Sequence, residues 1–442
     1  MPKVLIYGQS FNSNTGGGVT LSNLFSKWRK EDLAVLCTSH ANGNITKEIC
    51  DNYYFIGSDE LKWKFPFGLF QRNSKSGKLP IIESSTQGTF TIKPTIRNFI
   101  LFKALFPFLN WTGLQHMMFD SHPSENLLNW IKDFDPDILY VQVTSREAML
   151  FATSLTDILG IPMVLHQMDD WIGPISNSGL GKKYWAKTIN REFKHLAGKA
   201  DQCLSIGDFM GQEYEKRYGV EFLTFHNPVE LDKWMGSPET CKVPKKEYSV
   251  LYAGRTGFGI DSSLRNFADA LELFNKESAI KIKFYIQTAE ELQWPENYLY
   301  SFHRKLIPYN ELPNLFQQMD FLLLPCDFSD SAIKYLKYSM PTKAPEYMAS
   351  GTPIIILAPD QTAIYKYGQE NGFALMIDRG NPDYICKKLK EFVFDQKAKI
   401  ENCERGQELA RQRHSLSQVA QDFYELFNSV AVQRKSLVLD EK

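Results

Sequence analysis

The sequence lacks a large net charge of either sign: 50 lysines and arginines stand against 51 aspartates and glutamates among its 442 residues, a formal net charge of −1. This balance excludes a global field that would recruit nucleic acid, so we expect no nucleic-acid partner. Long apolar runs are also missing. The segment Phe99–Trp111 comes nearest, but Lys103 and Pro107 interrupt it and it is too short to span a bilayer.

Close cysteine pairs and metal-ligand spacings are absent as well. The seven cysteines are scattered, and none has a second cysteine or a histidine at zinc spacing. We therefore expect a reducing compartment and no metal. The N-terminal MPKVLIYG leads straight into an apolar strand, without the charged start and long apolar core of a signal peptide, so the expected location is the cytoplasm.

Three alternating acids, Asp133, Asp135 and Asp137, resemble a metal-binding D-x-D pattern. They precede the predicted strand Ile138–Val143 at its amino end, whereas parallel sheets bind ligands at the carboxyl ends of their strands. We interpret these acids as capping and solvated groups.

What the sequence does contain is a repeated alternation of short apolar runs with helical stretches. Runs that are apolar on both faces predict doubly wound parallel sheets in an α/β fold. In the first half the predicted strands are Lys3–Tyr7, Leu33–Thr38, Tyr53–Ile56, Ile138–Val143, Pro162–Gln167, Gln202–Ile206 and Phe222–Phe225. In the second half they are Val250–Tyr252, Ile282–Ile286, Phe321–Pro325, Pro353–Leu357 and Phe373–Ile377.

The length fits two domains, each large enough to bury a core. We expect one Rossmann-like domain over residues 1–235 and a second over 247–415, with a polar linker at 236–246. An amphipathic helix is predicted at 416–430.

A glycine triplet, Gly16, Gly17 and Gly18, follows the first predicted strand after a polar loop. Its distance from Gly8 does not match the G-x-G-x-x-G spacing of a dinucleotide site, so we discount NAD. The helix after the triplet should begin near Val19. The glycines either let a ligand approach the backbone closely or form a flexible connection.

The most informative stretch is 339–357, SMPTKAPEYMASGTPIIIL. Thr342 is the expected N-cap of a short helix that Gly351 ends. Lys343 and Glu346 lie in its first turns, where a helix N-terminus favours an anion. Lys343 can neutralise a phosphate and Glu346 can accept hydrogen bonds from ribose hydroxyls, which suits a nucleotide diphosphate. A solvated Lys and Glu on a surface turn are the alternative.

The string P-T-K-x-x-E-Y-M-A-S-G-T-P-I-I-I at 341–356 resembles the donor-site helix of bacterial retaining GT-B glycosyltransferases. Gly254 and Arg255, after the first strand of the second domain, resemble the G-R motif of that family. The resemblance implies two Rossmann-like domains facing across a cleft, with the acceptor on the first and the nucleotide-sugar donor on the second. It also implies that the helix at 416–430 returns to the first domain.

The resemblance also implies residue roles. Arg255 and Lys343 stabilise the departing nucleotide diphosphate, so that no metal and no cofactor beyond the nucleotide sugar is needed. The implied donor-binding residues are Gly254, Thr342, Glu346, Tyr338, Gly17 and Gly18. The sequence departs from the family at Tyr338, where a glutamate is frequent, and at Phe258 or Gly259, where a lysine is usual.

His166, Asp169 and Asp170 come at the carboxyl end of a predicted strand. By the resemblance His166 acts near the donor sugar, with the two acids as sugar or acceptor contacts. A core-edge histidine, with acids that cap the next loop, is the alternative. The loop 326–339 faces the transferred sugar in the resembled enzymes, which makes Asp327 and Ser329 candidates for sugar selectivity.

Segment 61–119 is aromatic and basic. It is either a covering layer for the sheet or an interfacial segment at the inner face of the plasma membrane, as in GT-B enzymes with lipid-linked acceptors.

The implied function is transfer of a sugar, with retention, from a nucleotide-diphosphate sugar to a glycan or polyprenyl-linked acceptor in bacterial capsule or O-antigen synthesis. Two alternatives stay open: a sugar-nucleotide 2-epimerase on the same fold, and a degenerate, non-catalytic subunit that binds nucleotide sugars.

Overall fold

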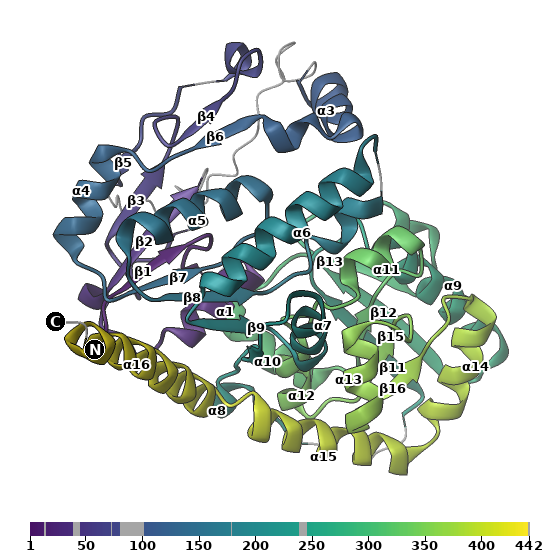
Figure 1. Cartoon of the computed structure of the whole chain (residues 1–442). Coiled ribbons are helices and arrows are strands. Elements are labelled where there is room, and N and C mark those ends of the chain that lie inside the picture. Colours follow the sequence, from purple (N-terminus) through teal and green to yellow (C-terminus); the bar gives the residue numbers. More distant parts are fainter. Residues whose placement is uncertain are drawn as a thin grey trace. The chain divides into compact units, whose positions relative to one another are not determined.

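The computed structural model describes residues 1–442 except 13–14, 39–44, 72, 80–100, 178, 238–244 and 441–442. Most of the predicted linker and part of segment 61–119 therefore lie outside the described residues. The chain divides into two compact units: Met1–Phe225 with Ala420–Lys442, and His226–Val419. Each unit is built on one large sheet with flanking helices (Figure 1), which confirms the predicted fold class of two Rossmann-like domains.

The first unit contains an eight-stranded sheet in the order β10-β9-β8-β7-β1-β2-β3-β5. Its strands are β1 (Val4–Tyr7), β2 (Leu33–Thr38), β3 (Tyr53–Ile56), β5 (Gly77–Lys78), β7 (Ile138–Val141), β8 (Met163–Gln167), β9 (Gln202–Ser205) and β10 (Phe222–Thr224). Neighbours pair in parallel except β3 with β5. A separate antiparallel pair joins β4 (Leu61–Trp63) to β6 (Phe119–Ser121).

The helices of the first unit cover both faces of this sheet. They are α1 (Gly16–Leu24), α3 (Phe106–Thr112), α4 (Glu125–Phe134), α5 (Arg146–Leu159), α6 (Lys182–Lys199), α7 (Asp208–Tyr218) and most of α16 (Leu416–Asp440). Short helical turns are η1 (Lys30–Asp32), η3 (Phe67–Phe70), η4 (Leu101–Leu105), η5 (Leu114–Met117) and η6 (Gly173–Asn177).

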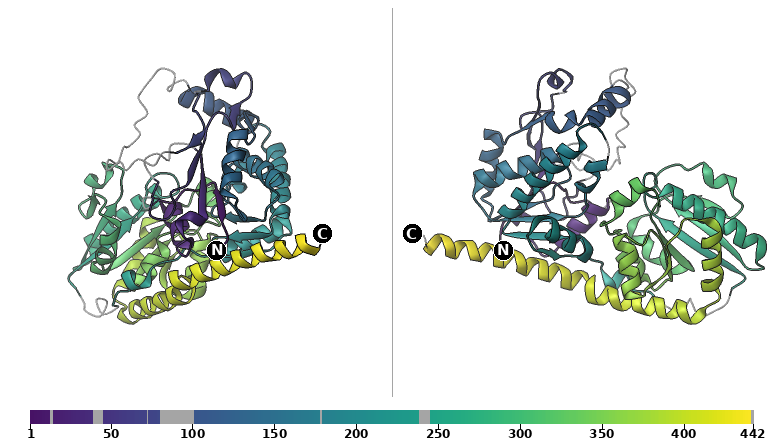
Figure 2. Two further views of the ribbon diagram at one scale, coloured as in Figure 1. Left: turned by 90° about the vertical axis from the view of Figure 1, so that its left-hand side faces the viewer. Right: turned by 45° about the vertical axis from the view of Figure 1, so that its right-hand side comes forward.

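Side chains alternate between the two faces of the sheet, and a different helix packs on each. Tyr7 points toward α5, where its ring lies 5.1 Å from that of Phe151. Tyr140 pairs with Ile6 and therefore points to the opposite face, where the Phe423 ring of α16 lies 6.1 Å away. Figure 2 shows α16 as one uninterrupted helix. Its aromatic side chains pack on this second face of the sheet.

The second unit contains a six-stranded parallel sheet in the order β13-β12-β11-β14-β15-β16. Its strands are β11 (Glu247–Ala253), β12 (Lys281–Gln287), β13 (Ser301–Arg304), β14 (Phe321–Pro325), β15 (Ile354–Leu357) and β16 (Ala374–Ile377). Its helices are α8 (Leu231–Trp234), α9 (Asp261–Glu277), α10 (Leu312–Gln318), α11 (Asp330–Leu336), α12 (Ala344–Ser350), α13 (Ala363–Asn371), α14 (Pro382–Val393) and α15 (Gln396–Arg413), with turns η8 (Trp294–Asn297) and η9 (Tyr309–Glu311).

Every predicted strand is present, but the sequence did not indicate β4, β5, β6 and β13. These strands are short, and β13 reads Ser-Phe-His-Arg at a sheet edge, without an apolar run.

Two helix starts also differ from the prediction. The helix α1 begins at Gly16, not near Val19, because the Thr15 hydroxyl accepts a hydrogen bond from the Gly18 N–H at 3.1 Å. The helix α12 begins at Ala344 with Lys343 as N-cap, so the prediction of Thr342 as N-cap was wrong.

Candidate functional site

The candidate site lies at the carboxyl edge of the second sheet, where β11 ends. The Tyr347 hydroxyl of α12 accepts a hydrogen bond of 3.1 Å from the Ala253 N–H, the last residue of β11. This bond fixes the start of α12 beside the turn that carries Gly254 and Arg255. Two segments predicted from separate motifs are thus brought together at the edge where parallel sheets bind ligands.

Lys343 and Glu346 form an ion pair in the first turn of α12. The Lys343 Nζ lies 3.2 Å from Glu346 Oε2, and the Tyr309 hydroxyl donates a hydrogen bond of 2.7 Å to Glu346 Oε1. The Glu346 residue is only 7% exposed. Burial and the adjacent carboxylate raise the pKa of Tyr309, so its phenol stays protonated and donates. Glu346 is therefore a buried hydrogen-bond acceptor whose position is fixed by Lys343 and Tyr309. It is not a solvated surface carboxylate.

Sequence reasoning missed Tyr309 and its neighbour Trp234. Their rings lie 5.5 Å apart, and the Lys343 Nζ lies 5.8 Å from the Tyr309 ring centre. Tyr309 follows β13, the edge strand that has no apolar signature. Recognising β13 would have placed Tyr309 at the same sheet edge as Glu346.

Arg255 is exposed and forms no ion pair with the residues that the structure describes. Its Nη1 donates to the Phe258 carbonyl at 3.1 Å, and the Tyr252 hydroxyl donates to the Arg255 carbonyl. A Cβ at Gly254 would come within 2.7 Å of the Tyr252 hydroxyl oxygen, so glycine is needed there for packing. The guanidinium thus remains available for an anionic ligand.

The loop after β14 is tied to the start of α9. Asp327 is buried, and its Oδ1 accepts a hydrogen bond of 2.7 Å from the Ser263 N–H. Asp327 Oδ1 therefore caps α9, while the role of Asp327 as a sugar contact stays a prediction. Ser329 is exposed and caps α11 by accepting from the Ala332 N–H at 3.3 Å. Tyr338 is half-buried, with the Lys337 Nζ 5.0 Å from its ring centre.

In the first unit, His166 lies in the core. Its ring has no exposed surface, Nδ1 lies 2.8 Å from the Tyr140 hydroxyl, and the Phe423 ring is 6.5 Å away. Burial lowers the pKa of His166 to about 3, so the imidazole is neutral. The prediction of His166 as a catalytic residue at the donor sugar is therefore wrong for this structure. Its strand position was right, but its side chain points to the face that α16 covers.

Asp170 is also structural. It is 2% exposed, and both carboxylate oxygens lie 3.0 Å from Arg217 Nη1. The Tyr214 hydroxyl donates to Asp170 at 3.0 Å and the Gly173 N–H at 3.1 Å. These bonds use the carboxylate within the fold, which corrects its prediction as a sugar or acceptor contact. Asp169, by contrast, is exposed.

The glycine triplet packs closely against its own loop. A Cβ at Gly18 would lie 2.1 Å from the Asn12 side chain, and one at Gly17 would lie 3.3 Å from Gln9. Gly18 is buried, which leaves Gly17 as the more accessible of the two predicted donor contacts.

Among the described residues, no helix is long and apolar enough to cross a membrane. The same part of the chain holds no cluster of His, Cys, Asp and Glu suited to a metal ion.

The fold of these two units is GT-B, the architecture of several nucleotide-sugar enzymes of known structure. No family model matches the sequence, and no curated protein matches it. Among solved structures, Anabaena HepE in complex with UDP and glucose is 13% identical with a TM-score of 0.56, covering 97% of this chain and 100% of HepE. Sucrose-phosphate synthase from Thermosynechococcus elongatus is 11% identical with a TM-score of 0.59, covering 97% and 99%. A glycosyltransferase from Rickettsia africae is 12% identical with a TM-score of 0.56, covering 97% and 98%.

Proposed function

We propose that the chain transfers a sugar, with retention, from a nucleotide-diphosphate sugar to a glycan or lipid-linked acceptor in bacterial surface-polysaccharide synthesis. The observation that carries the proposal is the Lys343–Glu346–Tyr309 cluster beside Arg255 at the carboxyl edge of the second sheet. The complexes of HepE with UDP and with UDP-glucose support a donor of this class on this fold.

In the proposed reaction, the bond between the anomeric carbon and the diphosphate oxygen breaks, and the electron pair leaves with the nucleotide diphosphate. Arg255 and Lys343 stabilise the charge that develops on this leaving group. An acceptor hydroxyl oxygen forms the new bond on the same face of the sugar, and its proton passes to a donor phosphate oxygen. Glu346 accepts hydrogen bonds from the ribose hydroxyls. These hydroxyls replace the Tyr309 phenol as hydrogen-bond donors to the Glu346 carboxylate.

A thermal-shift screen against UDP, GDP, ADP, CMP and their sugars tests donor binding. We expect one nucleoside diphosphate to stabilise the protein by about 2.7 kcal/mol at a hundredfold excess over its Kd, with or without EDTA. Product analysis with that donor then separates glycosyl transfer from 2-epimerisation and from binding without turnover. The absence of stabilisation by every nucleotide and nucleotide sugar in the panel would contradict the proposal.

The Glu346→Ala variant should bind the selected donor more weakly by about 1–3 kcal/mol, because ribose hydroxyls lose a buried acceptor. Titration calorimetry measures the change. Glu311→Ala is the matched control, since Glu311 is an exposed acid on η9. Equal donor affinity in both variants would remove the ribose role of Glu346.

We also propose that the first unit touches the inner face of the plasma membrane through segment 61–119. Apolar side chains in its described part are exposed: Phe65, Leu69, Phe70, Phe108, Trp111, Leu114 and Met117. Exposed lysines lie among them: Lys62, Lys64 and Lys103. Aromatic rings interleaved with basic groups suit a surface of anionic lipid.

Replacement of Phe65 and Trp111 by serine should weaken sedimentation with anionic phospholipid vesicles by about tenfold or more, because each ring loses its apolar burial. The control is Ile158→Ser on α5, which removes an exposed apolar side chain elsewhere. Equal sedimentation of both variants would leave segment 61–119 as a covering layer of the sheet.

A further inference from the structure

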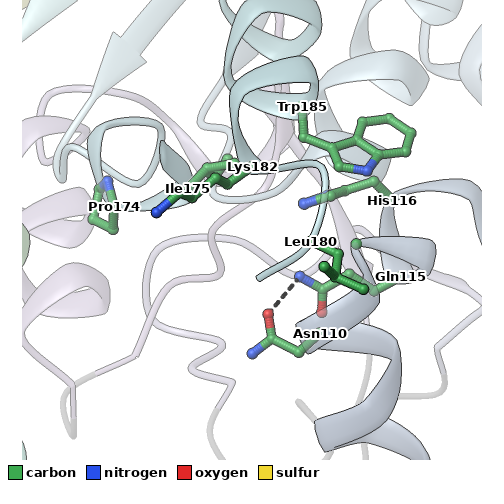
Figure 3. A pocket seen from close by; sticks show the side chains of 9 residues that line it. Asn110, Gln115, His116, Pro174, Ile175, Leu180, Lys182 and Trp185 are labelled. Atoms are coloured by element: carbon green, nitrogen blue, oxygen red, sulfur yellow. Dashed lines mark hydrogen bonds between the residues drawn. The ribbon is translucent and has the colours of Figure 1, made fainter. Parts of the chain in front are cut away.

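A pocket of about 250 Å³ opens in the first unit, between the end of α3 and the start of α6 (Figure 3). Its lining includes Asn110, Gln115, His116, Leu180, Lys182 and Trp185. The pocket residues on the α6 side come from the segment that follows β8. This segment leaves the first sheet at its carboxyl edge. Clefts for drug-sized ligands measure about 300–1,000 Å³, so this pocket suits a single small ring.

The aromatic wall of the pocket carries polar groups that the fold does not use. Trp185 is 9% exposed, and its indole N–H has no hydrogen-bond partner among the described residues. The His116 ring lies 5.0 Å from the Trp185 ring, and its nitrogens likewise lack a partner in the described part of the chain. Burial and the nearby Arg146 guanidinium lower the pKa of His116, so the neutral ring offers one donor and one acceptor.

Opposite this wall, two amides supply further hydrogen-bonding groups. Gln115 Nε2 donates to Asn110 Oδ1 at 3.1 Å, as Figure 3 shows. This bond leaves the Gln115 carbonyl oxygen and the Asn110 amide nitrogen for a ligand. Amides beside an aromatic face are suited to a ring that carries hydroxyl groups.

The charge of the pocket is positive. Lys182, in the first turn of α6, has no acidic partner among the described residues, and none of the lining residues is acidic. The first turn of α6 also has no acidic residue and no side-chain cap. Arg146 is already neutralised, because its Nε donates to Glu192 at 2.7 Å while its guanidinium covers the Trp185 ring at 5.2 Å. Within the described part of the chain, the free cation at the pocket is thus Lys182.

We propose that this pocket binds an anionic sugar unit of the acceptor, a single pyranose ring that carries a carboxylate or a phosphate. This inference rests on the proposed function. The ring lies against Trp185, its hydroxyls bind Gln115 and Asn110, and its anion pairs with Lys182. A neutral sugar would leave Lys182 without a partner, so the pocket selects for charge.

Titration of the full chain with three probes tests the proposal: methyl glucuronoside, glucose 1-phosphate and methyl glucoside, followed by tryptophan fluorescence and by saturation-transfer NMR. We expect saturable binding of at least one anionic probe, about tenfold tighter than the neutral one. The tighter of the two anionic probes identifies carboxylate or phosphate. Equal binding of charged and neutral probes, or no saturable binding of any probe, would overturn the proposal.

The Lys182→Gln variant should lose about tenfold in affinity for the anionic probe and bind the neutral one unchanged. Lys183→Gln is the matched control, since Lys183 is exposed on the same turn but does not line the pocket. Both lysines are exposed, so neither change threatens folding. Equal losses in the two variants would contradict a role for Lys182.

The thermal-shift response to nucleoside diphosphates separates the two proposals. Donor stabilisation without anionic-probe binding would overturn the pocket alone. Anionic-probe binding without any donor response would overturn the proposed function and leave an anionic sugar site.

Discussion

We expect the Lys343→Ala variant to transfer sugar roughly 10²- to 10³-fold more slowly than the wild type, the usual cost of removing one charge-stabilising donor from an active site. The Lys343 Nζ is already held 3.2 Å from Glu346 and is only 26% exposed, so little reorganisation precedes its contact with a phosphate. Steady-state kinetics with the selected donor measures the loss, which should fall mainly on kcat because the charge develops as the diphosphate leaves.

Three companion variants define what this loss means. Arg255→Ala should lower turnover in the same manner, and Glu346→Ala should affect donor binding more than turnover. Lys334→Ala is the control, since Lys334 is an exposed lysine in the last turn of α11 that the proposed site does not use. Small and equal effects of Lys343→Ala and Arg255→Ala on kcat would show that neither acts on the leaving group.

The Arg217→Ala variant should unfold more easily by about 3–5 kcal/mol, because it leaves the Asp170 carboxylate buried without its cation. The side chain of Asp170 is 1% exposed and that of Arg217 23%, so water cannot replace the lost guanidinium fully. The midpoint of urea unfolding, followed by circular dichroism, reports the change. Donor affinity should stay as in the wild type, since Arg217 has no recorded contact with Lys343, Glu346 or Arg255, the proposed donor-binding residues of the second unit.

Arg191→Ala provides the matched control, because Arg191 is an exposed arginine on α6 of the same unit. A surface change of this kind shifts stability by less than about 0.5 kcal/mol. If Arg217→Ala kept the wild-type stability but raised the KM for an acceptor, Asp170 would regain its role as a sugar contact.

The positions of the strands were predictable because buried parallel strands are continuous apolar runs. The strand Ile354–Ile356 and the helix before it, with Lys343 and Glu346, could be placed from local residue types alone. The placement of this helix beside the turn that carries Arg255 could not be predicted in the same way. It depends on the Tyr347–Ala253 hydrogen bond, which joins residues 94 positions apart.

Errors arose where the direction of a side chain decided its role. The sequence correctly placed His166 and Asp170 near the carboxyl end of β8. It did not show which face of the sheet each side chain occupies. His166 points to the face that α16 covers, and Asp170 points to Arg217, which is 47 residues further along the chain. Trp185 carried no local signal either, because an aromatic residue in an amphipathic helix usually packs on the sheet.

The first unit cannot be completed until the ribosome has made α16, because this helix belongs to the first unit but comes last in the chain. Phe423 and Phe427 lie against Phe25, Trp28 and Tyr140, and so seal one side of a sheet whose strands all precede residue 225. The entire second unit is synthesised before these two rings emerge. We therefore expect that, during translation, the apolar area that α16 covers stays exposed until the last residues are made, so the first unit is completed last although it is synthesised first.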